Sequence, residues 1–189
     1  MRILDLGCGR RKLPGSTGID ASTSSEADII HDLNRFPYPF DDSEFDGIVC
    51  RHILEHLDDI PRVMRELHRI LKPSGTLSII TPHFSCDNSY TDPTHKHHFS
   101  VRSFDYFIMG KRLAQDIYTE ALFEEKISKL VFSDIYRRGA FNINMHRCLG
   151  LEWIVNRYPR LYEKYFAFIF PSNEIIKELE AIKGCCKKG

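Results

Sequence analysis

The stretch Arg2-Ile3-Leu4-Asp5-Leu6-Gly7-Cys8-Gly9 decides the fold of this chain, because a short apolar strand runs directly into a glycine turn. After a short connection, Gly18-Ile19-Asp20 predicts a second strand that ends in an acid. Glycines let the backbone approach a ligand closely, and a carboxylate that closes the next strand accepts hydrogen bonds from ribose hydroxyls. The stretch therefore predicts a parallel sheet that holds a nucleoside at one edge.

Two later blocks agree with this prediction. Residues 45–57 read FDGIVCRHILEHL and residues 71–82 read LKPSGTLSIITP, each with a strand beside a turn or helix end. In this order the three blocks resemble the class I S-adenosylmethionine-dependent methyltransferases, strongly over residues 1–82 and weakly beyond. The resemblance implies an α/β fold with a Rossmann-like, mostly parallel twisted sheet of the seven-stranded methyltransferase type. We expect one domain over residues 1–189, with an inserted acceptor-side loop at about 83–100.

The resemblance also implies a cofactor and the residues that bind it. S-adenosylmethionine is the implied cofactor, Asp20 falls on the acid that binds its ribose, and Asp32 falls on the acid that faces its adenine amine. The full set of implied cofactor-binding residues is Asp5, Gly7, Cys8, Gly9, Asp20, Asp32, Leu33 and Arg51.

The chain departs from the family's pattern in its first half. Residues 10–17 leave no room for the usual helix between the first two strands, and Pro14 with Gly15 disfavours one further. We expect a loop there, in which Arg10, Arg11 or Lys12 replaces the helix dipole as the positive charge for the methionine carboxylate, unless these cations are merely solvated. The segment between Asp20 and Asp32 is similarly short.

The fold class is thus expected with shortened or missing first helices and a thinly covered sheet face. Parallel sheets are usually buried on both faces, so the late part of the chain or a second copy should cover it, which points to a homodimer.

The segment from His83 to Phe99 is the most unusual part of the chain, with four histidines, a cysteine and two aspartates after the fifth strand. As a substrate lid it would let His83, Asp92 or His95 orient or deprotonate the acceptor. As a structural turn, 92–95 would cap the segment that follows. A metal site is the third reading, from the ligand types His83, Cys86, Asp92, His95, His97 and His98, but their irregular spacing favours no metal.

His52 follows the fourth strand, where the reactive methyl group would lie, with Glu55 as its support or as part of a packed turn. The candidate catalytic residues are His52, His83, His95 and Asp92.

Composition narrows the function classes. Lysines and arginines balance aspartates and glutamates at 26 each, which argues against a nucleic-acid partner. No apolar run reaches membrane-spanning length, and the six cysteines show neither metal nor secretory spacing, so we expect a cytoplasmic protein.

The remaining elements are expected from periodicity. Helices are predicted at 58–71, 100–115 and 157–168, and strands at 76–81, 127–136 and 175–183, with a frayed tail from Cys185. The aromatic residues of the third helix could pack in the core or a dimer, line an acceptor pocket, or lie on a membrane.

The sequence predicts an enzyme that moves the methyl group of S-adenosylmethionine to a small-molecule acceptor. The alternative is a non-catalytic cofactor-binding subunit that acts through a partner protein. A dinucleotide-dependent oxidoreductase is disfavoured, because the chain lacks both the GxGxxG spacing and a helix N-terminus for a pyrophosphate.

Overall fold

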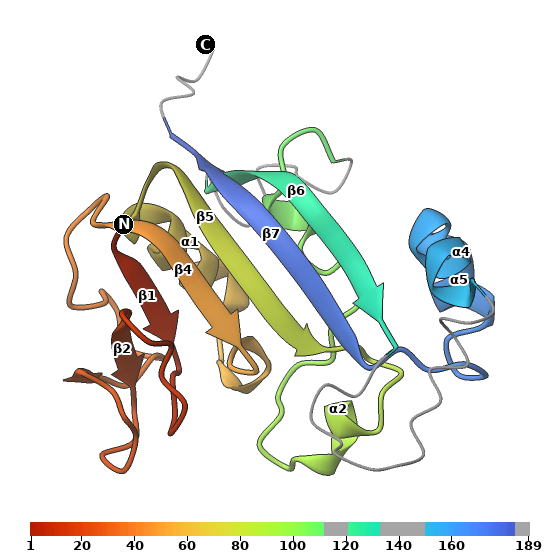
Figure 1. Cartoon of the computed structure of the whole chain (residues 1–189), viewed down its shortest axis with the longest axis horizontal. Helices are drawn as coiled ribbons and strands as arrows, with labels where there is room; N and C mark the ends of the chain where they lie inside the picture. The colour runs from red at the N-terminus through yellow and green to blue at the C-terminus, as the bar shows by residue number, and fades with distance from the viewer. Residues whose placement is uncertain (112–120, 133–149, 184–189) are drawn as a thin grey trace.

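The computed structural model describes residues 1–111, 121–132 and 150–183, and its strands form one seven-stranded sheet (Figure 1). The strand order is β3-β2-β1-β4-β5-β7-β6. Neighbouring strands are parallel except β7, which runs antiparallel to both β5 and β6. The Rossmann-like, mostly parallel sheet that the sequence predicts is confirmed. The strands are β1 (Ile3–Leu6), β2 (Thr17–Asp20), β3 (Ile29–Ile30), β4 (Phe45–Arg51), β5 (Leu71–Pro82), β6 (Leu122–Val131) and β7 (Glu174–Ile182).

The connections between the first three strands contain no helix, as the sequence predicts. Side-chain carboxylates hold these loops instead. The backbone N–H of Leu13 donates to Asp5 Oδ2 at 2.7 Å, and that of Gly9 donates to Asp20 Oδ2 at 2.9 Å. Because these carboxylates satisfy loop amides, the chain can cross between parallel strands without a covering helix.

Helix α1 (Ile60–Ile70) confirms the first predicted helix. Asp59 caps it by accepting a hydrogen bond from the Arg62 backbone N–H at 2.9 Å, and Pro61 lies in the first turn, where its missing N–H costs little. The other helical segments are short: η1 (Leu54–His56), α2 (Asn88–Thr91), η2 (Asp105–Phe107), α4 (Leu151–Arg157) and α5 (Pro159–Tyr165).

Two of the expected elements need correction. The helix expected at 100–115 is absent from 100–111, and residues 112–120 lie outside the described part. The Ser100 backbone N–H donates to Ser103 Oγ and that of Arg102 to Ser100 Oγ, so hydroxyls turn the chain there. The strand expected at 127–136 begins earlier, at Leu122, and its predicted end at 133–136 is not described.

The helix predicted at 157–168 and the strand predicted at 175–183 are confirmed as α5 and β7. Helix α4 was not predicted. The expected tail from Cys185 lies outside the described residues.

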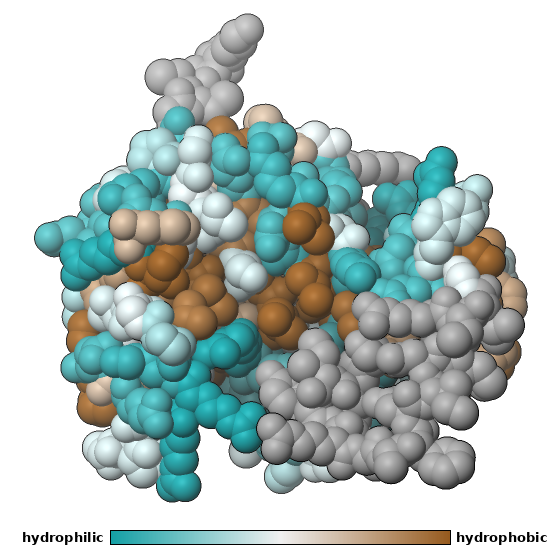
Figure 2. All heavy atoms as spheres, in the orientation of Figure 1, coloured by the Kyte–Doolittle hydropathy of each residue, from teal (hydrophilic) through white to brown (hydrophobic). Residues whose placement is uncertain are grey.

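The two faces of the sheet differ. Alternate strand residues that face α1 are fully buried in the hydrophobic core, such as Ile48, Leu77 and Leu179. Their strand neighbours on the opposite face, such as Val49 and Ile176, are only partly buried. Figure 1 shows that α4 and α5 lie beside β6 and not over this face, and Figure 2 shows apolar atoms exposed across its middle. In the described chain, the late segments therefore do not cover the face as the sequence suggested. No described helix is long and apolar enough to cross a membrane.

Candidate active site

The glycine turn after β1 adopts a conformation that requires glycine. Gly7 and Gly9 have φ angles of +66° and +55°. A side chain at Gly7 would also collide with Ile53, since an added Cβ would lie 2.6 Å from Ile53 Cδ1. The Asp20 carboxylate lies beside this turn, with one oxygen on the Gly9 amide and the other on the Ser22 amide at 2.8 Å. The predicted nucleoside-binding arrangement is thus assembled at the carboxyl ends of β1 and β2.

Asp5 provides a test of whether a cofactor fits this edge. Its side chain is 1% exposed, and its Oδ2 accepts hydrogen bonds from the Leu13 backbone N–H and from Arg51 Nη2 at 2.8 Å. Its Oδ1 is buried and has no hydrogen-bond partner among the described residues. Because an unpaired buried carboxylate oxygen is costly, this atom fits a bound donor such as the ammonium of a methionine moiety. Arg51 is held by Asp5 and by the Arg11 carbonyl at 2.9 Å.

The other residues of the predicted cofactor site differ in their exposure and in their existing hydrogen bonds and ion pairs. Asp32 is exposed and ion-pairs with Arg35 at 3.4 Å. Leu33 is a core residue whose carbonyl accepts a hydrogen bond from the Tyr38 hydroxyl. Cys8 is buried, and burial followed by the charge of Asp5 raises the pKa of its thiol to about 11.

Of the three loop cations, Lys12 forms an ion pair with Asp28 at 2.8 Å. Arg10 and Arg11 are exposed and form no ion pair with a described acid, so they remain the candidates for a carboxylate ligand.

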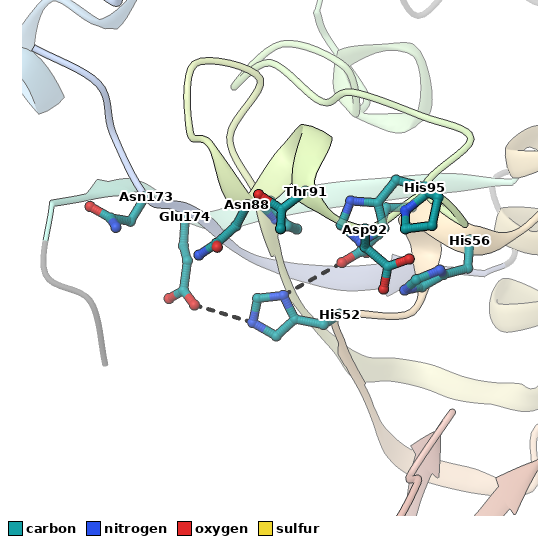
Figure 3. A pocket seen from close by; sticks show the side chains of 11 residues that line it. His52, His56, Asn88, Thr91, Asp92, His95, Asn173 and Glu174 are labelled. Atoms are coloured by element: carbon teal, nitrogen blue, oxygen red, sulfur yellow. Dashed lines mark hydrogen bonds and ion pairs between the residues drawn. The ribbon is translucent and has the colours of Figure 1, made fainter. Parts of the chain in front are cut away.

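A cleft of about 630 Å³ opens at the ends of β4 and β5, directly after Arg51 (Figure 3). Its floor includes His52, which adopts a left-handed backbone conformation at φ +50°. Non-glycine residues rarely adopt this conformation, and where they do it commonly marks a functional site. The lining is His52, Glu55, His56, Pro82, Asn88, Thr91, Asp92, Pro93, His95, Asn173 and Glu174.

His52 lies between two carboxylates. Its Nε2 is 3.1 Å from Glu174 Oε1 and its Nδ1 is 3.5 Å from Glu55 Oε1. The hydrogen bond to Glu174, followed by the 3.5 Å contact with the Glu55 carboxylate, raises the pKa of His52 to about 9. At neutral pH the imidazole is therefore protonated, and it acts as a hydrogen-bond donor toward the two carboxylates.

His83 is not part of the cleft, although the sequence placed it among the catalytic candidates. Its side chain is 0% exposed, its Nδ1 is bonded to Ser85 Oγ at 2.7 Å, and its Nε2 is bonded to Glu163 Oε1 at 3.1 Å. Both ring nitrogens are thus engaged, and the Nε2 bond links α5 to the end of β5. His83 is structural.

Asp92 and His95 line the cleft, as the lid interpretation requires. The same segment also forms the predicted structural turn, because Asp92 Oδ1 accepts hydrogen bonds from the Thr94 backbone N–H and hydroxyl at 2.8 and 2.7 Å. These bonds hold the pKa of Asp92 below its usual range. The six potential metal ligands of the loop do not converge: His97, for example, is bonded to the Leu57 carbonyl and His98 to Ser89.

Sequence reasoning missed the contribution of Glu174 and Asn173. They come from the start of β7, 122 positions after His52 in the case of Glu174, and nothing local in the sequence marks them. Asn88 and Thr91 of α2 were also missed, within a segment that the sequence did single out.

The comparisons with known proteins agree with this geometry. A family model described as a methyltransferase domain matches residues 4–79. A 2-phytyl-1,4-naphtoquinone methyltransferase of Nostoc punctiforme is 40% identical over 58 residues, which are 31% of this chain and 23% of that protein. The uncharacterized methyltransferase YcgJ of Bacillus subtilis is 30% identical over 90 residues, 42% of this chain and 36% of that one. The chain therefore spans only a quarter to about a third of the curated relatives it matches.

Among solved structures, a SAM-dependent methyltransferase from Archaeoglobus fulgidus superposes with a TM-score of 0.61 at 19% identity, over 95% of this chain and 85% of that one. Identity this low shows the shared fold. Together with the family match, it shows that residues 4–79 are similar to a methyltransferase domain and that the chain shares the fold of a SAM-dependent methyltransferase.

Proposed function

We propose that this protein transfers the methyl group of S-adenosylmethionine to a small-molecule acceptor held in the cleft beside His52. One observation carries the proposal: the cofactor edge and the cleft are contiguous. Arg51 is bonded to Asp5 of the cofactor edge, and the next residue, His52, lines the cleft. A donor bound at the first site would present its reactive group toward an acceptor in the second.

The reaction would be an in-line displacement. S-adenosylmethionine supplies a methyl group on a positively charged sulfur; the carbon–sulfur bond breaks as the bond to the acceptor forms, and a neutral thioether leaves. Asp20 would accept hydrogen bonds from the ribose hydroxyls, and Asp5 Oδ1 would accept one from the amino group. With a good leaving group, the main tasks of the protein are to align the two reactants and to exclude water.

The acceptor class follows from the cleft. Its lining is rich in imidazole, carboxylate and carboxamide groups, which suit a polar acceptor of small-molecule size. The net charge of zero gives no support to a nucleic-acid substrate, and we place the protein in the cytoplasm. The named substrate of the Nostoc relative is not transferred to this chain, because the match covers 23% of that protein.

The test is a calorimetric titration with S-adenosylmethionine and, separately, with NAD. We expect saturable binding of the first only, and its loss in Asp20→Ala. Asp46→Asn is the control. Asp46 lies near the start of β4, at the end of that strand away from Arg51 and the cofactor edge, and it pairs with Lys72. No binding of S-adenosylmethionine at about 1 mM, or unchanged binding in Asp20→Ala, would contradict the proposal.

The partly exposed sheet face supports a second candidate function. In this alternative, the protein is a cofactor-binding subunit that acts through another chain. Val49, Ile80 and Ile176 are only partly buried on this face. We propose that a second copy of this chain covers it, since parallel strands are normally buried on both sides. Light scattering should then give the mass of a dimer. Transfer of a labelled methyl group to any acceptor by the isolated protein would exclude the non-catalytic alternative.

A further inference from the structure

Three side chains converge on one side of the cleft. Glu55 and His56 belong to η1, and His95 belongs to the loop after α2. One potential ligand atom from each lies within 4.8 Å of the others. Figure 3 shows the rings of His56 and His95 close together, and their centroids are 4.6 Å apart. We propose that Glu55, His56 and His95 bind a divalent transition-metal ion, a role that methyl transfer does not require.

The hydrogen bonds around both imidazoles fix the tautomer that a metal needs. The Thr94 hydroxyl donates its only proton to Asp92, so its oxygen accepts from His56 Nδ1–H at 2.9 Å. The Ser89 carbonyl can only accept, so His95 Nδ1 carries the proton in their 3.1 Å contact. In each neutral ring the lone pair is therefore on Nε2. Oxygen acceptors behind the imidazole are the usual outer contacts of metal-binding histidines.

The Nε2 atoms of His56 and His95 have no hydrogen-bond partner among the described residues. Each imidazole is held at Nδ1 and open at Nε2, and both residues line the cleft. Satisfied core histidines, such as His83, engage both nitrogens instead.

Glu55 supplies an independent observation that points to a cation. The side chain is 1% exposed; its Oε2 accepts a hydrogen bond from Thr81 Oγ1 at 3.1 Å, while its buried Oε1 lacks a partner of hydrogen-bond geometry. The nearest cationic group, His52 Nδ1, is 3.5 Å away. A buried carboxylate oxygen in this state costs stability, and coordination of a cation would satisfy it.

Backbone contacts fix the relative positions of the two segments. The Glu55 carbonyl accepts hydrogen bonds from the Lys96 and His97 backbone N–H groups at 2.7 and 3.2 Å. The Lys96 ammonium also pairs with Asp58 at 2.6 Å. The loop that carries His95 is thus fastened to the turn that carries Glu55 and His56.

The donor set selects the class of ion. Two imidazoles and one carboxylate suit zinc, cobalt, iron or manganese, whereas magnesium and calcium prefer oxygen ligands alone. Because the three atoms are at most 4.8 Å apart, an ion placed among them would be no more than about 2.8 Å from each, and the ligands would close in by no more than roughly 0.7 Å to reach normal bond lengths. Three protein ligands leave coordination positions open toward the cleft, where a water molecule or an acceptor oxygen can bind.

The test uses the full chain, freed of metal by dialysis against a chelator and without S-adenosylmethionine. Cobalt(II) titration followed by visible absorption should give one ion per chain with d–d bands, and zinc(II) should displace it. His56→Ala and His95→Ala should each weaken binding at least about 10-fold, whereas the loop control His98→Ala should not. Thr94→Val, which keeps all three ligands but removes the acceptor behind His56, should also weaken binding about 10-fold.

Circular dichroism tests whether each variant is folded. If a histidine variant is unfolded, Glu55→Gln is measured in its place. Unchanged cobalt binding in these variants, or no stoichiometric binding by the wild type, would overturn the proposal. A sulfur-to-cobalt charge-transfer band would also overturn it, because it would place the ion on a cysteine. Since cobalt binding is measured without the methyl donor, its outcome is separate from that of the proposed methyl transfer.

Discussion

Gly7→Ala should destabilise the fold far more than Gly9→Ala, although both residues lie in one turn with positive φ. The alanine side chain in a left-handed conformation costs about 1–2 kcal/mol at either position. At Gly9 an added Cβ meets nothing within 4 Å, so that cost stands alone. At Gly7 the Cβ would overlap Ile53, with its Cδ1 and Cβ at 2.6 and 2.8 Å. Overpacking of this kind adds about 1–3 kcal/mol.

The expected losses are therefore about 3 kcal/mol for Gly7→Ala and about 1 kcal/mol for Gly9→Ala. In a chain of this size each kcal/mol lowers the melting temperature by about 2–4 °C, so the two variants should separate clearly in thermal and urea unfolding. In an Ile53→Ala background the cost of Gly7→Ala should fall but stay above that of Gly9→Ala, because the contact with Cδ1 is removed while the Cβ contact at 2.8 Å remains. Equal losses at the two glycines, or no rescue by Ile53→Ala, would refute the assigned packing of the turn.

Two further predictions concern the far edge of the sheet and the response to pH. The Asn156 side chain is hydrogen-bonded to both the backbone N–H and the C=O of Leu130 on the edge strand β6, at 2.7 and 2.9 Å. Asn156→Ala should therefore lower the free energy of unfolding in urea by about 2 kcal/mol. Trp153→Ala, on the exposed side of the same helix, should change it by under about 0.5 kcal/mol. Burial lowers the pKa of His68 below 6.5, so its neutral form stabilises the fold above the unfolded-state pKa, and this contribution is lost as pH falls through the folded-state value. The stability advantage of wild type over His68→Gln should shrink between pH 7.5 and about 5, and an advantage that grows would contradict the assignment.

The sequence predicted the elements whose signals are local. The apolar period and the Asp59 cap of α1 lie within one segment, as do the glycine turn and Asp20, and all of these are confirmed. Residues 100–111 have the same apolar spacing, yet they form turns, because the hydroxyls of Ser100 and Ser103 compete for the backbone amides that a helix would use. Periodicity identified the buried side chains there but not the backbone conformation.

The cleft could be predicted only in part, for a topological reason. His52, Asp92 and His95 follow parallel strands, and the carboxyl ends of such strands meet at one edge, so sequence order alone places them together. Glu174 lies at the same edge although it is at the start of its strand and not at the end. Because β7 runs antiparallel to β5, its first residue, not its last, lies where β5 ends, and Glu174 pairs in register with Pro82.

This reversal has a consequence for the chemistry. The sequence makes His52 a candidate to take a proton from the acceptor, with Glu55 as its support. With Glu174 added, His52 is bracketed by two carboxylates and carries the proton at neutral pH. In a fold of this topology, the start of the antiparallel strand therefore has to be counted with the ends of the parallel ones before a protonation state is assigned at the cleft.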